Sequence, residues 1–335
     1  MKSPFRRLKP KQFYYLIAAA VVIVAAVIYV EYRMGLRPVS DGGAAKQFVV
    51  QSGDNAPIVA DRLVKEGLIR NRNSFITYVN FHGLRGRLKQ GSYSISPTST
   101  AAQIAETLAA GRTLSKRLII PEGYTLRQIE NAAAEQGIPR EQFQAALAAP
   151  HAQSFLSGLP SGVSLEGYLF PDSYQVDSGT TATMLVDAML DNFGKRVSSE
   201  YVQAFAAQGL TLHQGLTLAS IVEREVNIEA DRPIVAQIFL KRFRTGQSLG
   251  SDVTTIYAAE LIGKEFDINL DSPYNTRRYT GLTPGPICSP GLSALDAVAS
   301  PATTDYTYFL SGKDGKTYFA KTYAQHQQNI VKYLD

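Results

Sequence analysis

Several residue types that define whole classes of protein are scarce in this sequence. One of its 335 residues is cysteine (Cys288), and none is tryptophan. A single cysteine cannot form an intramolecular disulfide, which excludes a disulfide scaffold. The four histidines lie too far apart in the chain for the ligand spacing of a zinc finger, and we expect no metal site. These histidines are His82, His151, His213 and His326.

Basic residues outnumber acidic residues only near the N-terminus. The chain has 34 Lys and Arg against 29 Asp and Glu, a net charge of +5. Residues 1–12 hold five of the basic residues and no acidic one, so the rest of the chain is balanced at 29 against 29. Nucleic-acid binding depends on an excess of positive charge, and a neutral body gives no reason to expect nucleic acid as a partner.

An uninterrupted run of apolar and aromatic residues follows at residues 13–30. As a helix, these 18 residues span about 27 Å, close to the hydrocarbon thickness of a bilayer. A cleaved secretory signal has a similar pattern, but Glu31, Tyr32 and Arg33 are not the small residues of a cleavage site. We therefore predict a transmembrane helix over residues 13–30.

The distribution of positive charge predicts the orientation of this helix. The basic segment 1–12 is expected to stay in the cytoplasm as a short tail, and the chain beyond the helix to lie outside the cytoplasmic (inner) membrane. A single-pass protein with its body outside the cytoplasm has no ready supply of ATP or nicotinamide cofactors. Polymers of the cell envelope become the expected substrates.

The part outside the membrane divides into a linker, a small unit and a larger one. Residues 31–46 have the composition of a linker. A strand-like stretch, a turn and an amphipathic helix closed by glycine recur, with the glycines at Gly67, Gly111 and Gly137. Residues 47–115 resemble, in this pattern, the LysM-like fold that binds glycan chains, and a purely structural spacer explains the pattern as well. Residues 116–335 are expected to form a larger mixed α+β domain, so the fold class is α+β.

The segment 217–226 (TLASIVEREV) predicts a buried helix that carries two acids. Both sides of the helix are apolar around Glu223, and a carboxylate there is costly unless it is paired, protonated or in a cleft. Burial raises the pKa of a carboxyl toward the range that a general acid needs. Glu225 lies about 200° further round the helix, so the two acids do not form a glycosidase pair. The alternative for Glu223 is an ion pair with a nearby arginine, namely Arg224, Arg232 or Arg242.

Two further segments predict ordered loops. Residues 165–174 (LEGYLFPDSY) combine aromatic residues, two acids and a proline. Residues 271–301 concentrate proline and glycine, and within them Tyr274 and Asn275 offer groups that stack on a sugar or bond its hydroxyls. A structural crossover loop explains the second segment equally well.

Four motifs, LEGYLFPDSY, LASIVERE, DSPYNTRRYTGL and the closing TDYTYFL, occur in the order of a known family. On these motifs the chain resembles the YceG-like family of membrane-anchored endolytic murein transglycosylases. The resemblance implies non-hydrolytic cleavage of the β-1,4 bond between MurNAc and GlcNAc in nascent peptidoglycan, which leaves a 1,6-anhydroMurNAc end. It implies peptidoglycan glycan strands as substrate and peptidoglycan synthases as partners. Because the C6 hydroxyl of the substrate attacks, one acid suffices and no cofactor is expected.

The resemblance also implies roles for individual residues. The catalytic glutamate of the family is expected at Glu223, the first acid of IVERE. The residues expected to bind substrate are Glu166, Tyr168, Ser251, Asp252, Tyr274 and Asn275. The chain departs from the family pattern at Val253, Thr283 and Ser289, and it has Thr317 where the family carries a histidine.

Two other function classes remain open. Residues 246–250 match the G-x-S-x-G pattern of a serine hydrolase around Ser248, with His326 and one of Asp271, Asp296 or Asp305 further along the chain. The segment before Ser248 does not resemble the buried strand that this pattern needs. The other class is a non-catalytic envelope scaffold that binds glycan and recruits synthases.

Overall fold

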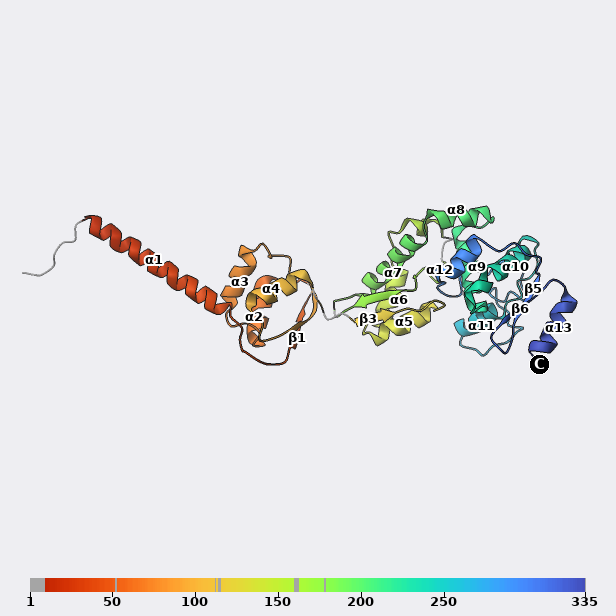
Figure 1. Cartoon of the computed structure of the whole chain (residues 1–335), viewed down its shortest axis with the longest axis horizontal. Helices are drawn as coiled ribbons and strands as arrows, with labels where there is room; N and C mark the ends of the chain where they lie inside the picture. Colours follow the sequence, from red (N-terminus) through yellow and green to blue (C-terminus); the bar gives the residue numbers. More distant parts are fainter. Residues whose placement is uncertain are drawn as a thin grey trace, which may run out of the picture. The chain divides into compact units, whose positions relative to one another are not determined.

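The chain folds into two compact units in the computed structural model, which describes residues 10–51, 53–111, 113, 116–159, 163–177 and 179–334 (Figure 1). Unit 1 runs to Lys116 and includes Asp177–Thr180, and unit 2 comprises the remaining residues from Arg117 onward. Helices predominate, and the described strands form three two-stranded sheets. The predicted α+β class is confirmed.

Unit 1 begins with a long apolar helix, α1 (Pro10–Gly35). Among the described residues, one segment, Tyr14–Gly35, is long and apolar enough to cross a membrane, with a mean hydropathy of 2.2 and no buried residue in its apolar window. From Tyr14 to Val30 the helix exposes its apolar side chains all round, which a water-soluble surface helix does not do. Most of the predicted cytoplasmic tail, residues 1–9, lies outside the described residues.

The rest of unit 1 is a small sheet packed against three helices. Strands β1 (Lys46–Val50) and β2 (Gly91–Ile95) pair antiparallel with Phe48 opposite Tyr93, and both of these rings are fully buried. The helices are α2 (Ala56–Lys65), α3 (Arg72–Phe81) and α4 (Ala101–Ala110). A capping box of Thr100 and Gln103 starts α4, and Gly111 ends it in the left-handed conformation, as its sequence predicts. The likeness of this unit to LysM domains stays a prediction.

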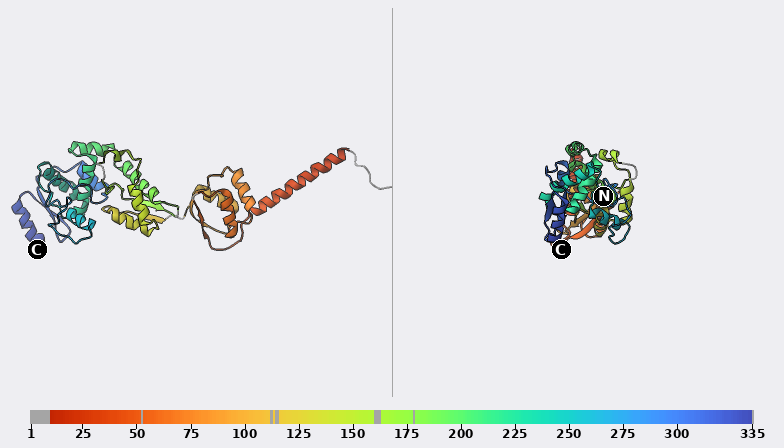
Figure 2. Two further views of the ribbon diagram at one scale, coloured as in Figure 1. Left: turned by 180° about the vertical axis from the view of Figure 1, so that it is seen from behind. Right: turned by 90° about the vertical axis from the view of Figure 1, so that its right-hand side faces the viewer.

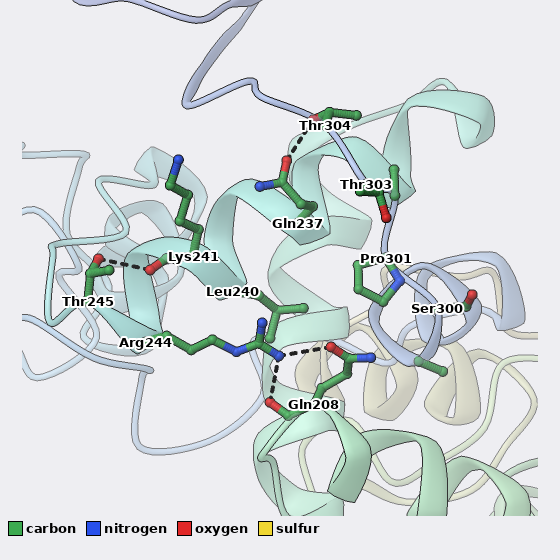
Figure 3. A pocket seen from close by; sticks show the side chains of 12 residues that line it. Gln208, Gln237, Leu240, Lys241, Arg244, Thr245, Ser300, Pro301, Thr303 and Thr304 are labelled. Atoms are coloured by element: carbon green, nitrogen blue, oxygen red, sulfur yellow. Dashed lines mark hydrogen bonds between the residues drawn. The ribbon is translucent and has the colours of Figure 1, made fainter.

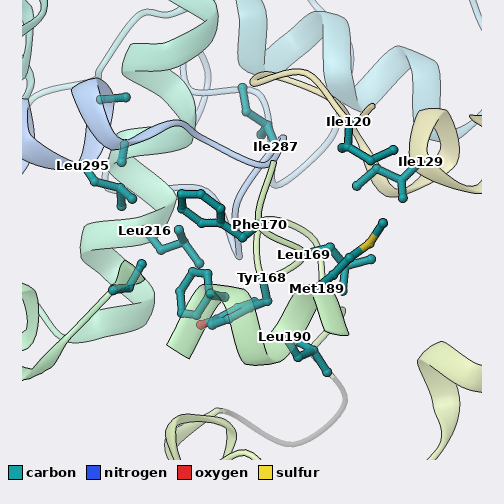
Figure 4. Close-up of a cluster of buried hydrophobic side chains, with 14 of the residues drawn as sticks. Ile120, Ile129, Tyr168, Leu169, Phe170, Met189, Leu190, Leu216, Ile287 and Leu295 are labelled. Atoms are coloured by element: carbon teal, nitrogen blue, oxygen red, sulfur yellow. The ribbon is translucent and has the colours of Figure 1, made fainter. Parts of the chain in front are cut away.

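Unit 2 begins with a two-stranded sheet formed by β3 (Lys116–Ile119) and β4 (Ser173–Val176). The helical elements between and after these strands are α5 (Leu126–Glu135), α6 (Arg140–Ala148), the 3₁₀ turn η1 (Ser154–Gly158) and α7 (Ala182–Arg196). The LEGYLFPDSY segment fills the core between them, and Figure 4 shows Tyr168, Leu169 and Phe170 among side chains of α7, α9 and α12.

The remaining elements of unit 2 surround one central helix, α9 (Leu212–Glu225), which a capping box of Thr211 and Gln214 starts. Helix α9 contacts α8 (Ser199–Ala207), α10 (Arg232–Arg244), α11 (Asp252–Leu261) and α12 (Leu292–Ala299), so the buried helix predicted for 217–226 is confirmed. The short turn η2 (Glu229–Asp231) joins α9 to α10. At the C-terminal end, α13 (Tyr323–Tyr333) packs on the hairpin of β5 (Tyr308–Ser311) and β6 (Thr317–Ala320) (Figure 2).

Candidate active site

Glu223 forms a buried ion pair. Its Oε1 accepts a hydrogen bond of 2.6 Å from Nη2 of Arg232, and its Oε2 accepts one of 3.0 Å from the backbone N–H of Gly291. Glu223 is 9% exposed and Arg232 is 5% exposed. Arg232 also donates from Nε to the carbonyl of Val226 at 3.3 Å. Both oxygens of Glu223 thus serve to join α9, α10 and the start of α12, and the ion-pair alternative is confirmed for Arg232.

A third charged side chain lies beside this pair. The carboxyl group of Glu122 rests against Gly291, so closely that a Cβ atom on Gly291 would lie 1.9 Å from Cδ of Glu122. Partial burial and the negative charge of Glu223 raise the pKa of Glu122, while the charge of Arg232 opposes that shift. The absence of a side chain at Gly291 therefore allows two acids to approach the same arginine.

Glu225, the last residue of α9, lies in a different environment. It lines a groove of about 520 Å³ together with residues from α10, α11, α13 and the β5–β6 hairpin. The hydroxyl of Ser251 donates to its Oε1 at 2.5 Å, and no described residue donates to its Oε2. Desolvation raises the pKa of Glu225, and the charges of Arg277 and Arg242 offset this rise in part. A carboxyl group whose pKa is raised and that borders a groove is suited to general acid catalysis.

Polar and aromatic side chains form the walls of the Glu225 groove. Asp252 and Arg277 form an ion pair at one side. The guanidinium group of Arg242 lies 6.0 Å from the ring centroid of Tyr308, and it donates to the carbonyl of Thr307 at 3.1 Å. Charged groups together with an aromatic ring match the needs of a sugar, which has apolar faces and a rim of hydroxyls.

A histidine completes the groove. The imidazole of His326 stacks on Tyr308 with a centroid separation of 5.2 Å. Burial and the charge of Arg242 lower its pKa, and its Nδ1 is buried without a hydrogen-bond partner. The ring is therefore neutral at physiological pH.

A model of the YceG-like family matches residues 48–332. This chain belongs to the YceG-like family. A Bacillus subtilis protein named endolytic murein transglycosylase is 31% identical over 323 residues, which cover 89% of this chain and 88% of that protein. A Streptococcus pneumoniae protein of the same name is 31% identical over 320 residues, which cover 85% of this chain. The crystal structure of a YceG-like protein from Listeria monocytogenes superposes with a TM-score of 0.56 at 28% identity, covering 85% of this chain and 98% of that one.

The relatives differ in length. The matched region covers 58% of the pneumococcal protein, so this chain spans little more than half of that relative. The family match begins at residue 48, within β1, and therefore does not include α1.

The structure brings two of the predicted binding residues to Glu225 and its groove. Ser251 is 2% exposed and bonds Glu225, and Asp252 lines the groove. Asn275 is fully buried instead, where its amide donates to the carbonyls of Ile268 and Leu270 at 2.9 and 2.8 Å. It shapes the 271–301 loop, and direct contact with substrate is not possible in this conformation. Tyr274 packs on Tyr257 with a centroid separation of 5.1 Å and is half-buried.

The two predicted residues of the LEGYLFPDSY motif lie elsewhere. Tyr168 is 1% exposed, and its hydroxyl bonds Nδ1 of His213 at 2.9 Å, so it is a core residue and not a substrate contact. Glu166 accepts hydrogen bonds from the N–H of Leu126 at 2.9 Å and the hydroxyl of Tyr257 at 3.0 Å. It lines a separate pocket of about 250 Å³, and burial raises its pKa to about 7.

The serine-hydrolase alternative does not fit the structure. Ser248 follows helix α10 in a loop, not a strand, and its hydroxyl donates to the carbonyl of Thr276. Asp305 forms an ion pair with Lys321 at 3.0 Å, and His326 stacks on Tyr308. The elements of a nucleophile elbow are therefore not assembled around Ser248.

In the part of the chain that the structure describes, no group of three or more His, Cys, Asp or Glu residues is placed to hold a metal ion.

Proposed function

We propose that this chain is an endolytic murein transglycosylase that cuts peptidoglycan glycan strands internally. Membership of the YceG-like family and the names of the Bacillus and Streptococcus relatives support the activity and the substrate class. The groove that Glu225 lines, with its aromatic and charged walls, supports the use of this site for a saccharide.

The proposed proton donor is Glu225 rather than Glu223. A general acid must be protonated before the reaction and must border the space that the substrate occupies. Glu225 has a raised pKa and lines the groove, whereas Glu223 gives both oxygens to Arg232 and Gly291. The position of Glu225 on the groove is the observation that carries the proposal.

In the proposed reaction, one carboxyl group acts twice. Glu225 first gives its proton to the glycosidic oxygen between MurNAc and GlcNAc as the bond from that oxygen to C1 of MurNAc breaks. The C6 hydroxyl of the same MurNAc then forms a bond to C1, and the carboxylate takes the proton of that hydroxyl. The product ends in 1,6-anhydroMurNAc, the proton returns to Glu225, and no water is consumed. Ser251, through its hydrogen bond to Oε1, orients the carboxyl so that Oε2 faces the substrate.

The apolar helix α1 supports a place at the inner membrane. We propose that α1 remains as an uncleaved anchor with its N-terminus in the cytoplasm, so that both units act on new strands outside the membrane. The part of unit 1 that follows α1 is then a positioning module, LysM-like or a plain spacer, that lies between the anchor and unit 2 in the chain. Peptidoglycan synthases, which produce these strands, are the proposed protein partners.

The test compares Glu225→Gln with Glu223→Gln in the full chain, purified in detergent and given uncrosslinked glycan strands. Loss of a general acid costs about 10²–10⁴-fold in rate, so Glu225→Gln should lose nearly all anhydro-ended products while it keeps the fold. Glu223→Gln should be less stable but retain cleavage at low temperature. Mass spectrometry identifies the ends of the products.

Three results would contradict parts of this proposal. Retained cleavage by Glu225→Gln together with its loss in a folded Glu223→Gln would return the acid role to Glu223. Reducing ends in place of anhydro ends would mean hydrolysis. Binding of strands by the wild-type chain without any cleavage would favour the non-catalytic scaffold.

A further inference from the structure

A second cavity lies on the other side of α10 from the Glu225 groove. Its volume is about 590 Å³, and residues of α10, the end of α8 and the segment 299–304 line it. Figure 3 shows Gln237 and Arg244 of α10 on one side and Ser300 and Thr303 on the other. The catalytic proposal does not use any of these residues.

The side chains around this cavity are polar, and the charged ones are all positive. The guanidinium group of Arg244 donates from Nη2 to the backbone carbonyl and to Oε1 of Gln208, at 2.9 and 2.8 Å, which fixes its position. The side-chain ammonium group of Lys241 has no hydrogen-bond or ion-pair partner among the described residues. No acidic residue is among those that line the cavity. Two cations without a compensating acid create a positive potential that favours an anionic ligand.

Amide and hydroxyl groups add hydrogen-bonding capacity to these charges. Gln237 accepts a hydrogen bond of 2.7 Å from the hydroxyl of Thr304, which leaves its NH₂ group available. Ser300 and Thr303 present further hydroxyls from the facing segment. A ligand with carboxylates and amides, such as a peptide, matches this lining better than a neutral sugar, which has no charge to pair with Lys241 or Arg244.

The same two segments of the chain contribute residues to the cavity and to the Glu225 groove. On α10, Arg242 reaches the groove, while Lys241 and Arg244 on either side of it line the cavity. The segment that leaves the cavity at Thr304 enters the groove at Tyr308, four residues later. Four residues span at most about 14 Å, so one substrate molecule can reach both places.

We propose that this cavity is a subsite for the stem peptides of the glycan strands, with Lys241 and Arg244 pairing with peptide carboxylates. The inference rests on the proposed function, because it assigns a second part of the same substrate to a second site. Recognition of the peptide next to the cut would make the enzyme prefer strands that still carry their stems.

The test uses two forms of one substrate, glycan strands with stem peptides and the same strands after an amidase has removed them. In Lys241→Glu the KM for peptide-bearing strands should rise by about tenfold or more, the loss of one charge-assisted contact, while the KM for stripped strands stays unchanged. Lys195→Glu, an equal charge change at an exposed position of α7, is the matched control and should behave as wild type. An equal effect of Lys241→Glu on both substrates, or none on either, would overturn the proposal.

A binding measurement separates this inference from the proposed function. Calorimetry with a soluble disaccharide-peptide as the probe should show binding by Glu225→Gln that the double variant with Lys241→Glu loses. If the wild type cuts neither substrate but this difference in binding remains, the cleavage proposal fails and the subsite stands. If the wild type cuts strands but Lys241→Glu binds the probe normally, the subsite is wrong and the cleavage proposal stands.

Discussion

The ion pair between Glu223 and Arg232 makes a strong prediction about stability. In Glu223→Ala the guanidinium group of Arg232, only 5% exposed, loses its counter-charge inside the protein. Removal of one partner of a buried ion pair costs about 3–5 kcal/mol in free energy of unfolding. For a domain of about 150–250 residues each kcal/mol lowers Tm by about 2–4 °C, so the expected fall is about 6–20 °C. The same variant removes the acceptor of the hydrogen bond from the Gly291 N–H, so the start of α12 should be destabilised as well.

Thermal unfolding of the full chain in detergent measures the size of this effect, and hydrogen exchange of the α9 and α12 amides shows that it lies in unit 2. The double variant Glu223→Leu with Arg232→Met should recover most of the loss, because replacing both charges leaves neither unpaired. Nη1 of Arg232 is buried without a hydrogen-bond partner, so replacing Arg232 by methionine also removes an unsatisfied polar atom, which favours recovery of stability in the double variant. A change in Tm below about 2 °C in Glu223→Ala, combined with complete loss of cleavage, would refute the structural role and restore Glu223 as the acid.

Three other predictions follow from single contacts. Burial holds a proton on Glu166 up to a pKa of about 7, so the folded chain binds more protons than the unfolded chain between about pH 4.5 and 7, and this group should lower the free energy of unfolding by about 3 kcal/mol as pH rises through that range. In urea unfolding at several pH values, the fall in wild type should exceed the fall in Glu166→Gln by this amount, because the raised pKa values of Glu122 and Glu225 contribute to the fall in both chains. The hydroxyl of Ser251 lowers the pKa of Glu225, so Ser251→Ala should move the alkaline limb of the pH profile of cleavage to higher pH, and an unmoved limb would contradict the contact. Gly215→Ala would place a Cβ 2.4 Å from the buried ring of Phe205 and should destabilise the chain by about 1–3 kcal/mol in thermal unfolding, although alanine favours helix more than glycine does; a stabilised variant would show that the ring moves freely.

The features that the sequence predicts best depend on local contacts. The apolar run 13–30, the strand-then-helix units and the buried helix around 217–226 all follow from periodicity and capping residues within a few positions of each other, and the structure confirms them. The roles within the 271–301 loop were harder to predict. Asn275 carries a side chain that suits a sugar, yet its partners are the carbonyls of Ile268 and Leu270, which become neighbours once the loop has folded.

Residues of the C-terminal hairpin and helix were missing from the predicted site for a similar reason. Tyr308 and His326 lie far along the chain from Glu225, and they reach the groove because α13 packs on β5 and β6. No spacing rule relates such distant residues. The TDYTYFL motif indicated that this segment belongs to the family pattern, but it did not predict which of its aromatic side chains lines the groove.

The choice between Glu223 and Glu225 shows most clearly what local reasoning lacks. Both acids lie in the last turn of α9, where the partial negative charge of the helix C-terminus disfavours any carboxylate. Arg232, from the next helix, pairs with Glu223, whereas Glu225 accepts a hydrogen bond from the neutral hydroxyl of Ser251. The charges of Arg242 and Arg277 offset the desolvation of Glu225 in part, and its pKa stays raised. This difference in partners, which the IVERE motif does not reveal, is the reason that we propose Glu225 as the proton donor.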